Sequence, residues 1–344
     1  MRTPRIPSSN SLRAAALIAA VLLAPAARAA EAPEPGALLD LALAPPTISY
    51  AGHVMVTQWY GKQTRAEEMI VRVLPPDRVR REFLAPDGTV ARVSISDGDR
   101  ESVLLVRSGK TVLGNAVRSD EKVLAPELER ETLLSNYDLS VSTAEKVAGR
   151  ATWKLNLVPK VDGKSWQTLW IDQETRIVLR TKRWQPRRRF VTQAQFMSFE
   201  PRKPQNEELF RIEDSTDEVI QARSLSPEFL TLEQLGAATG GTRLPEALPG
   251  GFVFESADVF EVRNSSVRHA RYTDGLTVLS VFETDRPVKL PKGNAIPSGR
   301  EALPGPLRAS LAGKVLQWKV GPRNYTMMGD VSRDLMAVIA RKLP

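Results

Sequence analysis

Few side chains in this sequence could carry out covalent or metal-dependent chemistry. The chain has no cysteine and only two histidines, His53 and His269, both on predicted strands. A zinc site needs three or four Cys, His or carboxylate ligands, and a Cys/His nucleophile pair needs a thiol. The sequence also lacks a Gly-x-Ser-x-Gly nucleophile elbow and a Gly-rich phosphate loop. We therefore predict a protein that has no metal site and no cofactor and is not an enzyme.

Asp172 and Glu174 remain as a pair that could act as acid and base. Paired carboxylates can exchange protons with a substrate. Both residues, however, belong to the polar segment 172–175, which lies between two apolar stretches. Asp and Thr in such a segment stabilise a reversal of the chain through side-chain hydrogen bonds to the backbone. We interpret the pair as turn residues.

The strongest polar feature is a run of basic residues between positions 180 and 189. Guanidinium groups hold phosphate and carboxylate through paired hydrogen bonds, so the run could attract anionic headgroups or an acidic protein segment. Trp184 and Pro186 lie inside the run, and the aromatic ring would add stacking or acyl contact. The alternative is a solvated hairpin tip, and the sequence leaves both interpretations open. The residues assigned to partner or anion binding are Arg183, Arg187, Arg188 and Arg189, and Arg180 and Lys182 complete the run.

A second candidate site consists of apolar side chains that alternate with polar ones. Trp153, Leu155 and Leu157 fall on one face of a stretch whose other face carries Lys154 and Asn156. This two-residue period is typical of a half-buried strand. Such a face forms the core of a domain or, where covering helices leave space, a cavity for an apolar ligand. The residues assigned to this ligand-binding face are Trp153, Leu155, Leu157, Leu169, Ile171 and Phe196.

Most of these candidate residues belong to three predicted antiparallel strands between positions 147 and 184. A turn at Asp162-Gly163 separates the first strand from the second, and the polar turn at 172–175 separates the second from the third. The middle strand, at residues 166–171, carries large apolar groups on both faces. We therefore expect a curved sheet that encloses a ligand or a covering helix.

Turn residues divide the surrounding sequence into further short strands, which is the pattern of an antiparallel meander. A helix is expected at residues 36–44, before Pro45 and Pro46, and another at 127–137, directly after Pro126. The first of these helices should plug one end of the sheet. The strands predicted outside the central three cover residues 47–60, 67–74, 77–84, 90–96, 101–106 and 190–200.

The alternating pattern fails after residue 200, which indicates the edge of a domain. A Gly-rich stretch at 237–242 is the expected hinge. Beyond it, residues 269–283 predict two strands around an Asp274-Gly275 turn, and Ser332 is the expected N-cap of a final helix. The other features expected in this part are strands at 316–320 and 325–328 and a helical apolar stripe of Leu335, Met336, Ile339 and Leu343.

The length of 344 residues favours two domains, because one core rarely grows that large. The first 29 residues place three arginines before an apolar run at 14–24 and small residues around Arg28, the order of a secretory signal peptide. The apolar run is too short for a stable anchor, and no later segment reaches the roughly 20 apolar residues of a membrane-spanning helix. We therefore expect an exported, soluble protein with no membrane span. The predicted boundaries are a signal peptide at 1–29, a first domain at 30–215, a linker at 216–245 and a second domain at 246–344.

The net charge argues against nucleic-acid binding. The formal charge of +8 includes four arginines of the predicted signal peptide, and without them 44 basic residues face 40 acidic ones, a net charge of +4. Domains that bind nucleic acid usually carry a stronger excess on one face. The absence of cysteine also excludes disulfides and a lipidated amino-terminal cysteine. The packing of side chains must then stabilise the protein.

Two groups of residues resemble the RseB/MucB family of periplasmic regulators of an envelope-stress sigma factor. Residues 147–150 and the strand after them, together with residues 169–175, are similar to the amino-terminal domain of that family. The family usually continues with Gly-Leu-Pro-Leu-Lys, whereas residues 176–180 of this chain are Arg-Ile-Val-Leu-Arg. Residues 272–276, Tyr-Thr-Asp-Gly-Leu, resemble the Tyr-Ser-Asp-Gly-Leu hairpin of the family's carboxy-terminal domain.

This resemblance implies both a fold and a function. The family's first domain is similar to the lipoprotein carrier LolA, a half-open antiparallel β-barrel with plugging helices. The implied fold class is therefore α+β, with such a barrel followed by a smaller α+β domain. By resemblance the protein is periplasmic and binds the periplasmic domain of an anti-sigma factor, which it shields from proteolysis. It would release that partner when lipid-bearing envelope components, such as the acyl chains of lipoproteins or lipopolysaccharide, enter the barrel.

Two alternatives to this regulator remain. The first is a periplasmic carrier of lipoproteins or lipids of the LolA type, which would transport acyl chains without a regulatory partner. The second, which is weaker, is an enzyme that acts on envelope polymers. The second domain favours the regulator, because carriers of the LolA type lack it.

Overall fold

The computed structural model describes residues 32–60, 63–98, 100–115, 126–186, 190–212, 219–221, 230–239, 244–262, 265–287, 294–295, 307–310 and 313–343. The expected signal peptide at 1–29 lies outside these residues, and so do Arg187, Arg188 and Arg189 of the basic run. None of the helices within the described ranges is long and apolar enough to cross a membrane.

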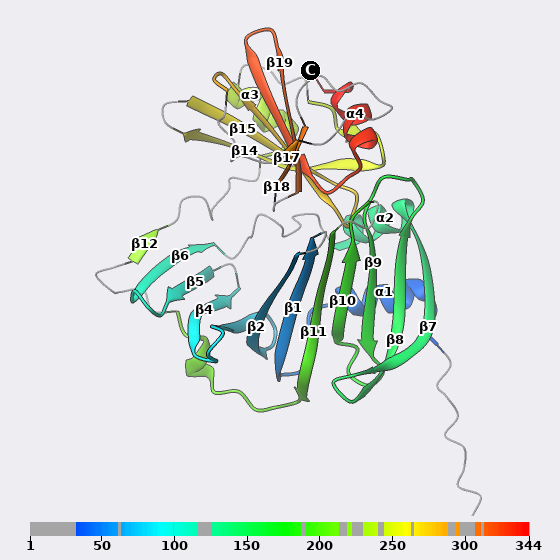
Figure 1. Ribbon diagram of the computed structural model, residues 1–344, viewed down its shortest axis with the longest axis vertical. Helices are drawn as coiled ribbons and strands as arrows, with labels where there is room; N and C mark the ends of the chain where they lie inside the picture. The colour runs from blue at the N-terminus through cyan, green and yellow to red at the C-terminus, as the bar shows by residue number, and fades with distance from the viewer. Residues whose placement is uncertain are drawn as a thin grey trace, which may run out of the picture. The chain divides into compact units, whose positions relative to one another are not determined.

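The first part of the chain forms one large, mostly antiparallel sheet, in which twelve strands are described (Figure 1). From β1 the meander runs outward through β2 to β6, and the chain then returns through β7 to β11, so that β11 pairs with β1. Short β12 pairs with β6 in parallel at one edge, and β7 forms the other edge. The strands are β1 (Tyr50–Tyr60), β2 (Gln63–Leu74), β3 (Arg78–Leu84), β4 (Val90–Asp97), β5 (Arg100–Leu105), β6 (Lys110–Asn115), β7 (Tyr137–Val147), β8 (Arg150–Pro159), β9 (Trp166–Asp172), β10 (Val178–Trp184), β11 (Phe190–Pro201) and β12 (Val219–Gln221).

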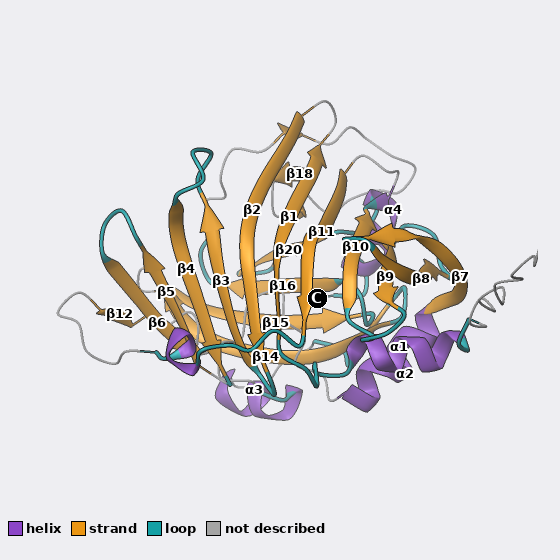
Figure 2. Cartoon of the chain, turned by 90° about the horizontal axis from the view of Figure 1, so that it is seen from below, coloured by secondary structure: helices purple, strands orange, loops and turns teal. Residues whose placement is uncertain are grey.

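The three central strands predicted from the sequence are β8, β9 and β10, each antiparallel to the next. The sheet curls strongly here, because β7 touches β11 although three strands lie between them in the sheet order (Figure 2). Curling brings the two ends of this group together without closing the ladder, which is the geometry of a half-open barrel.

Two helices cover one face of the curled strands. Helix α1 (Pro35–Leu43) begins where the Glu34 side chain accepts a hydrogen bond from the Ala37 amide, at 2.9 Å, and helix α2 is Pro126–Asn136. Both contact β7, and α1 also contacts α2 and β8. These helices confirm the two predicted for the first domain. Figure 2 shows them next to each other beside β8 and β9.

A smaller antiparallel sheet forms the second part of the chain, with eight described strands in the order β13-β14-β15-β16-β20-β19-β18-β17. Helix α4 (Arg333–Ala340) begins at Ser332, whose hydroxyl accepts a hydrogen bond from the Leu335 amide at 3.1 Å. The predicted hairpin is β15 and β16, and the four residues of the predicted helical stripe are buried. The strands are β13 (Ala247–Leu248), β14 (Phe252–Val262), β15 (Ser265–Thr273), β16 (Val278–Thr284), β17 (Asn294–Ala295), β18 (Leu307–Ser310), β19 (Gly313–Val320) and β20 (Arg323–Gly329).

The segment expected to link the two sheets contains elements of both. Strand β12 belongs to the first sheet, whereas Leu230 pairs with Ala257 of β14 in the second. Helix α3 (Leu232–Thr239) also contacts β14, and its last three residues coincide with the start of the expected hinge. The expected fold class is confirmed: a curled antiparallel sheet with covering helices precedes a smaller sheet that carries its own helices.

A set of buried polar contacts joins the two sheets. The Lys164 ammonium, in the turn between β8 and β9, lies 3.2 Å from the Asp274 carboxylate in the turn between β15 and β16, and both side chains are fully buried. The Tyr137 hydroxyl donates to the same carboxylate at 2.7 Å. Gly275 has a φ of +91°, and a Cβ there would overlap Leu133 of α2. The Asp274-Gly275 pair therefore serves both as a hairpin turn and as a close contact with the first sheet.

Candidate functional site

Five of the six residues predicted to form the apolar ligand-binding face lie together. Trp153, Leu155 and Leu157 of β8 share one buried cluster with Leu169 and Ile171 of β9. The register explains this grouping, since β8 and β9 pair directly at these positions. Leu38 and Leu39 of α1, Leu133 of α2 and Tyr137 of β7 complete the cluster, and all four are buried. The two helices thus cover this face.

Phe196 lies elsewhere. It packs in a separate cluster with Val54 of β1, Trp170 of β9 and Leu179 of β10, and its ring lies edge-on to Phe199 with centroids 5.3 Å apart. The β1–β11 pairing is irregular next to Phe196, and sequence alternation alone cannot locate such an irregularity. Grouping Phe196 with the other five as one apolar face was therefore wrong. Because Trp170 belongs to this second cluster, both faces of β9 are buried, as the sequence predicted.

One exposed ion pair ties the two covering helices together. The Arg130 guanidinium of α2 donates to the Asp40 carboxylate of α1 at 2.5 Å, and about half of each side chain is exposed. The buried leucines hold α1 against the sheet more strongly than this ion pair does. The ion pair is nevertheless a contact that can be removed without disturbing the apolar cluster.

The basic run continues into a surface on which cations and tryptophans alternate across strands. Lys154 of β8, Trp170 of β9 and Arg180 of β10 occupy one row of the sheet. The Arg180 guanidinium lies 4.8 Å from the centre of the Trp170 ring and the Lys154 ammonium 5.9 Å, distances at which a cation is attracted to the ring face. We call this surface, with the next rows, the cation–tryptophan face.

Further rows of this face repeat the arrangement. The Lys182 ammonium lies 5.3 Å from the ring centre of Trp184 and 5.7 Å from that of Trp59, so one cation contacts tryptophans of two strands. Trp166 and Trp184 are direct cross-strand partners with ring centroids 5.6 Å apart. Arg180 is also paired with Glu145 at 2.5 Å and Trp170 is buried, so the attraction of this face for anions rests on Lys154 and Lys182. The basic run thus indicated the cations, but only the register brings in Lys154, Trp59 and Trp166.

Arg183 does not belong to this face, because it points to the other side of β10. Its guanidinium donates to the Thr277 hydroxyl of the second sheet at 3.1 Å. It also lines a small polar cavity of about 220 Å³ at the boundary between the two sheets. Arg187, Arg188 and Arg189 lie outside the described residues, so their assignment to anion binding stays a prediction.

A shallow hollow of about 780 Å³ lies on the second sheet, between the start of α3 and strands β13 and β14. Leu232, Val253 and Phe254 give it an apolar floor, and the exposed Glu233 and Glu246 give it acidic edges. This combination suits an apolar segment flanked by basic residues. No pattern in the sequence indicated this hollow, because its walls come from segments that are joined only in the folded chain.

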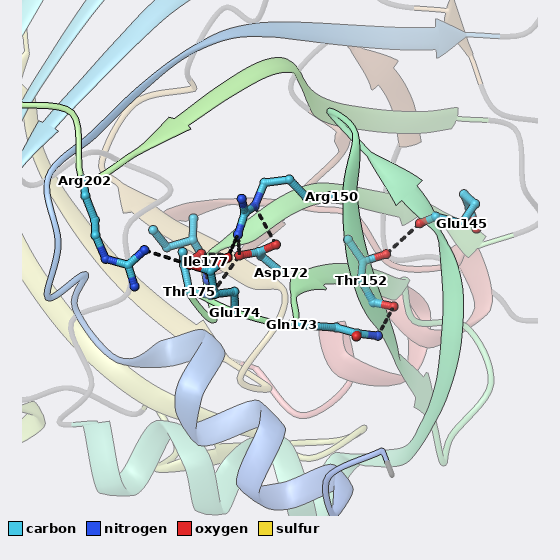
Figure 3. A network of polar contacts seen from close by, with 9 residues as sticks. All are labelled: Glu145, Arg150, Thr152, Asp172, Gln173, Glu174, Thr175, Ile177 and Arg202. Carbon is cyan, nitrogen blue, oxygen red and sulfur yellow. Dashed lines mark hydrogen bonds and ion pairs between the residues drawn. The ribbon is translucent and has the colours of Figure 1, made fainter. Parts of the chain in front are cut away.

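Asp172 and Glu174 are held in a network of polar contacts at the β9–β10 turn (Figure 3). Arg150 binds both Asp172 oxygens at 2.8 Å and Glu174 at 2.8 Å, and Arg202 binds the other Glu174 oxygen at 2.8 Å. The Thr175 amide and hydroxyl also donate to Asp172. Burial alone would raise the pKa of Asp172, but the bonds from Arg150 and Thr175 outweigh it and lower the pKa. A carboxylate bonded in this way stays ionised and braces the turn, as predicted.

The two histidines occupy structural positions. His269 stacks on Phe282 with ring centroids 4.3 Å apart, and its burial, with a smaller effect from the Arg271 charge, lowers its pKa to about 4. His53 lies 3.1 Å from Glu68 on the neighbouring strand. Within the described part of the chain, no group of His, Asp or Glu is arranged to hold a metal ion.

Comparisons with known proteins agree with this architecture. The model of the MucB/RseB amino-terminal domain matches residues 39–221, which is more than half of the chain. The chain belongs to the MucB/RseB family. A comparison with curated protein sequences finds no significant match.

Solved structures of MucB resemble the whole architecture. The complex of MucA and MucB from Pseudomonas aeruginosa superposes with a TM-score of 0.56 at 17% identity, covering 90% of this chain and 97% of the matched chain. A second complex, of MucB with MucA(peri), gives the same TM-score and identity and covers 89% of this chain. At this identity the likeness concerns the fold. It extends over both sheets, including the second, which the family model does not reach.

One residue of the β9–β10 turn has an unusual backbone conformation. Arg176, which follows the Glu174-Thr175 pair, has a φ of +65°. Glycine adopts this left-handed conformation at little cost, whereas other residues are strained in it. The Arg176 guanidinium lies 4.3 Å from the centre of the Trp153 ring, an attraction that offsets part of the strain.

Proposed function

We propose that this protein is a periplasmic regulator of envelope-stress signalling that binds the periplasmic segment of an anti-sigma factor and protects it from proteolysis. The observation that carries the proposal is the likeness to MucB in its complexes with MucA, which covers 90% of this chain. This likeness includes the second sheet, and carriers of the LolA type lack that domain. The alternative function as a carrier is therefore less well supported.

Protease protection tests the regulator directly. The periplasmic segment of an anti-sigma factor from the same organism would be digested with a limiting amount of periplasmic protease, with and without this protein. We expect a stable complex on size-exclusion chromatography and slower cleavage of the segment. Unchanged cleavage, together with the absence of a complex, would refute the proposal.

Export to the periplasm rests on the predicted signal peptide at residues 1–29. Intact-mass measurement of protein released from the periplasm is expected to give the chain without these residues. Full-length protein confined to the cytoplasm would refute this location and, with it, the partner.

Two features are suited to an acidic or anionic partner: the cation–tryptophan face and, in the sequence, the basic run that continues to Arg189. Peripheral charges act mainly on the association rate and lose their effect as salt rises. Replacing Arg187, Arg188 and Arg189 with Ser should therefore slow association and flatten its salt dependence. A control variant with Arg202, Lys203 and Arg211 replaced by Ser removes the same charge elsewhere. Equal kinetics for the two variants would make the run a solvated hairpin tip.

Sensing of lipid-bearing components would use the apolar cluster beneath α1, which includes Trp153, Leu155 and Ile171. Acyl chains can enter only if α1 moves, so loosening α1 should speed their binding. Arg130→Gln removes the exposed ion pair to Asp40 and should raise the rate of fatty-acid binding. Stopped-flow measurement with a fluorescent fatty acid tests this expectation. An unchanged rate, with Arg202→Gln as the control, would show that chains do not enter beneath α1.

A further inference from the structure

A polar cavity lies where the first sheet meets the second. Its volume is about 220 Å³, room for about seven water molecules at roughly 30 Å³ each. All the side chains that line it are polar: Gln167, Thr181, Arg183, Gln185, Thr192 and Asp330. The first five come from the first sheet and the segment directly after β10, whereas Asp330 follows β20 in the second.

The cavity contains one cation and one anion that do not neutralise each other. Arg183 bonds to Thr277, but its Nε–H has no hydrogen-bond partner. Oδ1 of Asp330 also has none. No ion pair among the described residues joins Arg183 to Asp330, although both line the same small cavity. A buried charged group whose polar atoms lack hydrogen bonds raises the free energy of the folded protein. A molecule that made hydrogen bonds to both groups would remove this cost and so gain affinity.

The lining restricts the chemistry of such a molecule. None of its lining residues is an apolar residue, so this cavity differs from the cluster beneath α1. Arg183 can form an ion pair with an anionic hydrogen-bond acceptor, and Asp330 can form one with a cationic hydrogen-bond donor. The amides of Gln167 and Gln185 and the hydroxyls of Thr181 and Thr192 can donate and accept between them.

We propose that this cavity binds a small zwitterion of the amino-acid or short-peptide type, with its carboxylate on Arg183 and its ammonium on Asp330. The two unpaired atoms are themselves buried, so both side chains must turn for these atoms to face the ligand. The residues that line this site differ from those of the apolar cluster beneath α1. Because its two charged residues come from different sheets, the ligand bridges the two domains.

The test uses the full chain without its signal peptide. Glycylglycine is the probe, and its binding is measured by isothermal titration calorimetry and by the shift in melting temperature. Saturable binding is expected, with a higher melting temperature. N-acetyl-glycylglycine lacks the ammonium and glycylglycinamide lacks the carboxylate, so each should bind at least about tenfold more weakly. Glucose, a neutral polyol of similar size, should bind no better than these two.

Two variants locate the site. Asp330→Asn keeps the shape of the side chain and Arg183→Gln keeps a polar group there, whereas each removes one charge, and each should weaken glycylglycine binding at least about tenfold. The matched controls Arg323→Gln and Asp285→Asn alter an ion pair on the second sheet away from the cavity and should bind as the parent does. Absence of saturable binding to glycylglycine would overturn the proposal, and so would equal binding of the blocked peptides or of glucose. N-acetyl-glycylglycine and glycylglycinamide, the blocked peptides, test the proposal on the unchanged protein even if a variant fails to fold.

Discussion

The buried pair of Lys164 and Asp274 should determine how firmly the two sheets are joined. At 3.2 Å and an effective dielectric constant of about 20, their attraction is about 5 kcal/mol before the cost of dehydration. Asp274→Asn leaves the Lys164 ammonium buried without its counter-charge, and removing one partner of a buried pair costs about 3–5 kcal/mol. Lys164→Met should cost less, because Asp274 keeps the Tyr137 hydroxyl and the amides of its own turn.

Urea unfolding followed by tryptophan fluorescence measures both effects. We expect the double variant Lys164→Met/Asp274→Asn to be more stable than the sum of the two single effects predicts, because no buried charge is then left alone. Coupling between contacting residues of this kind amounts to about 0.5–3 kcal/mol. If Asp274→Asn costs less than about 1 kcal/mol, or if the two single effects simply add, the pair does not hold the sheets together.

Three further perturbations test other contacts. Arg150→Met removes the cation that pairs with the buried Asp172 and should lower the free energy of unfolding by about 3–5 kcal/mol. The exposed control Arg202→Met should lower it by at most about 1 kcal/mol in the same urea titration. His269 has its pKa lowered from 6.5 to about 4, so the unfolded chain takes up a proton before the folded one as the pH falls. Stability should therefore drop by roughly 3 kcal/mol between pH 6.5 and pH 4, and His269→Phe should abolish that part of the pH dependence. Arg176→Gly should leave the free energy of unfolding nearly unchanged, because relief of strain offsets the lost contact with Trp153. Arg176→Ala keeps the strain and should lower that free energy by about 1 kcal/mol. Equal effects of the two variants in thermal unfolding would contradict this.

Local patterns predicted the elements whose signals are local. Strands β8, β9 and β10, helix α2 and the β15–β16 hairpin all have regular alternation or helical spacing between strong turn residues. Strand β7 was not predicted, because it lies at the edge of the sheet and its burial alternates only weakly between exposed and half-buried positions. Edge strands are often polar, which removes the apolar signal on which the alternation argument depends.

The candidate site was predicted less completely, because its geometry depends on which strands are neighbours. Trp59 lies more than a hundred residues from Lys182 in the sequence, yet the pairing of β1 with β11 brings both to the cation–tryptophan face. Lys164 and Asp274 are 110 positions apart, and nothing near either residue indicates the other. Periodicity shows on which side of a strand a residue lies, but the pairing of strands decides what it meets there.

The arrangement of β8 and β9 suggests how ligand and partner binding could influence each other. One face of these strands carries the apolar cluster beneath α1, and the turn between them carries Lys164 and Ser165, which contact the second sheet. Close-packed cores change between discrete arrangements rather than deform gradually, so if acyl chains displace α1 as proposed, the strands that it covers would shift. Such a shift reaches the Lys164–Asp274 pair directly through the turn. If a fatty acid changes the affinity for the anti-sigma segment by some factor, linkage requires that the segment change the affinity for the fatty acid by the same factor. The Asp274→Asn variant should reduce the factor by which each ligand changes the affinity for the other, because it weakens the Lys164–Asp274 contact that couples the two sheets.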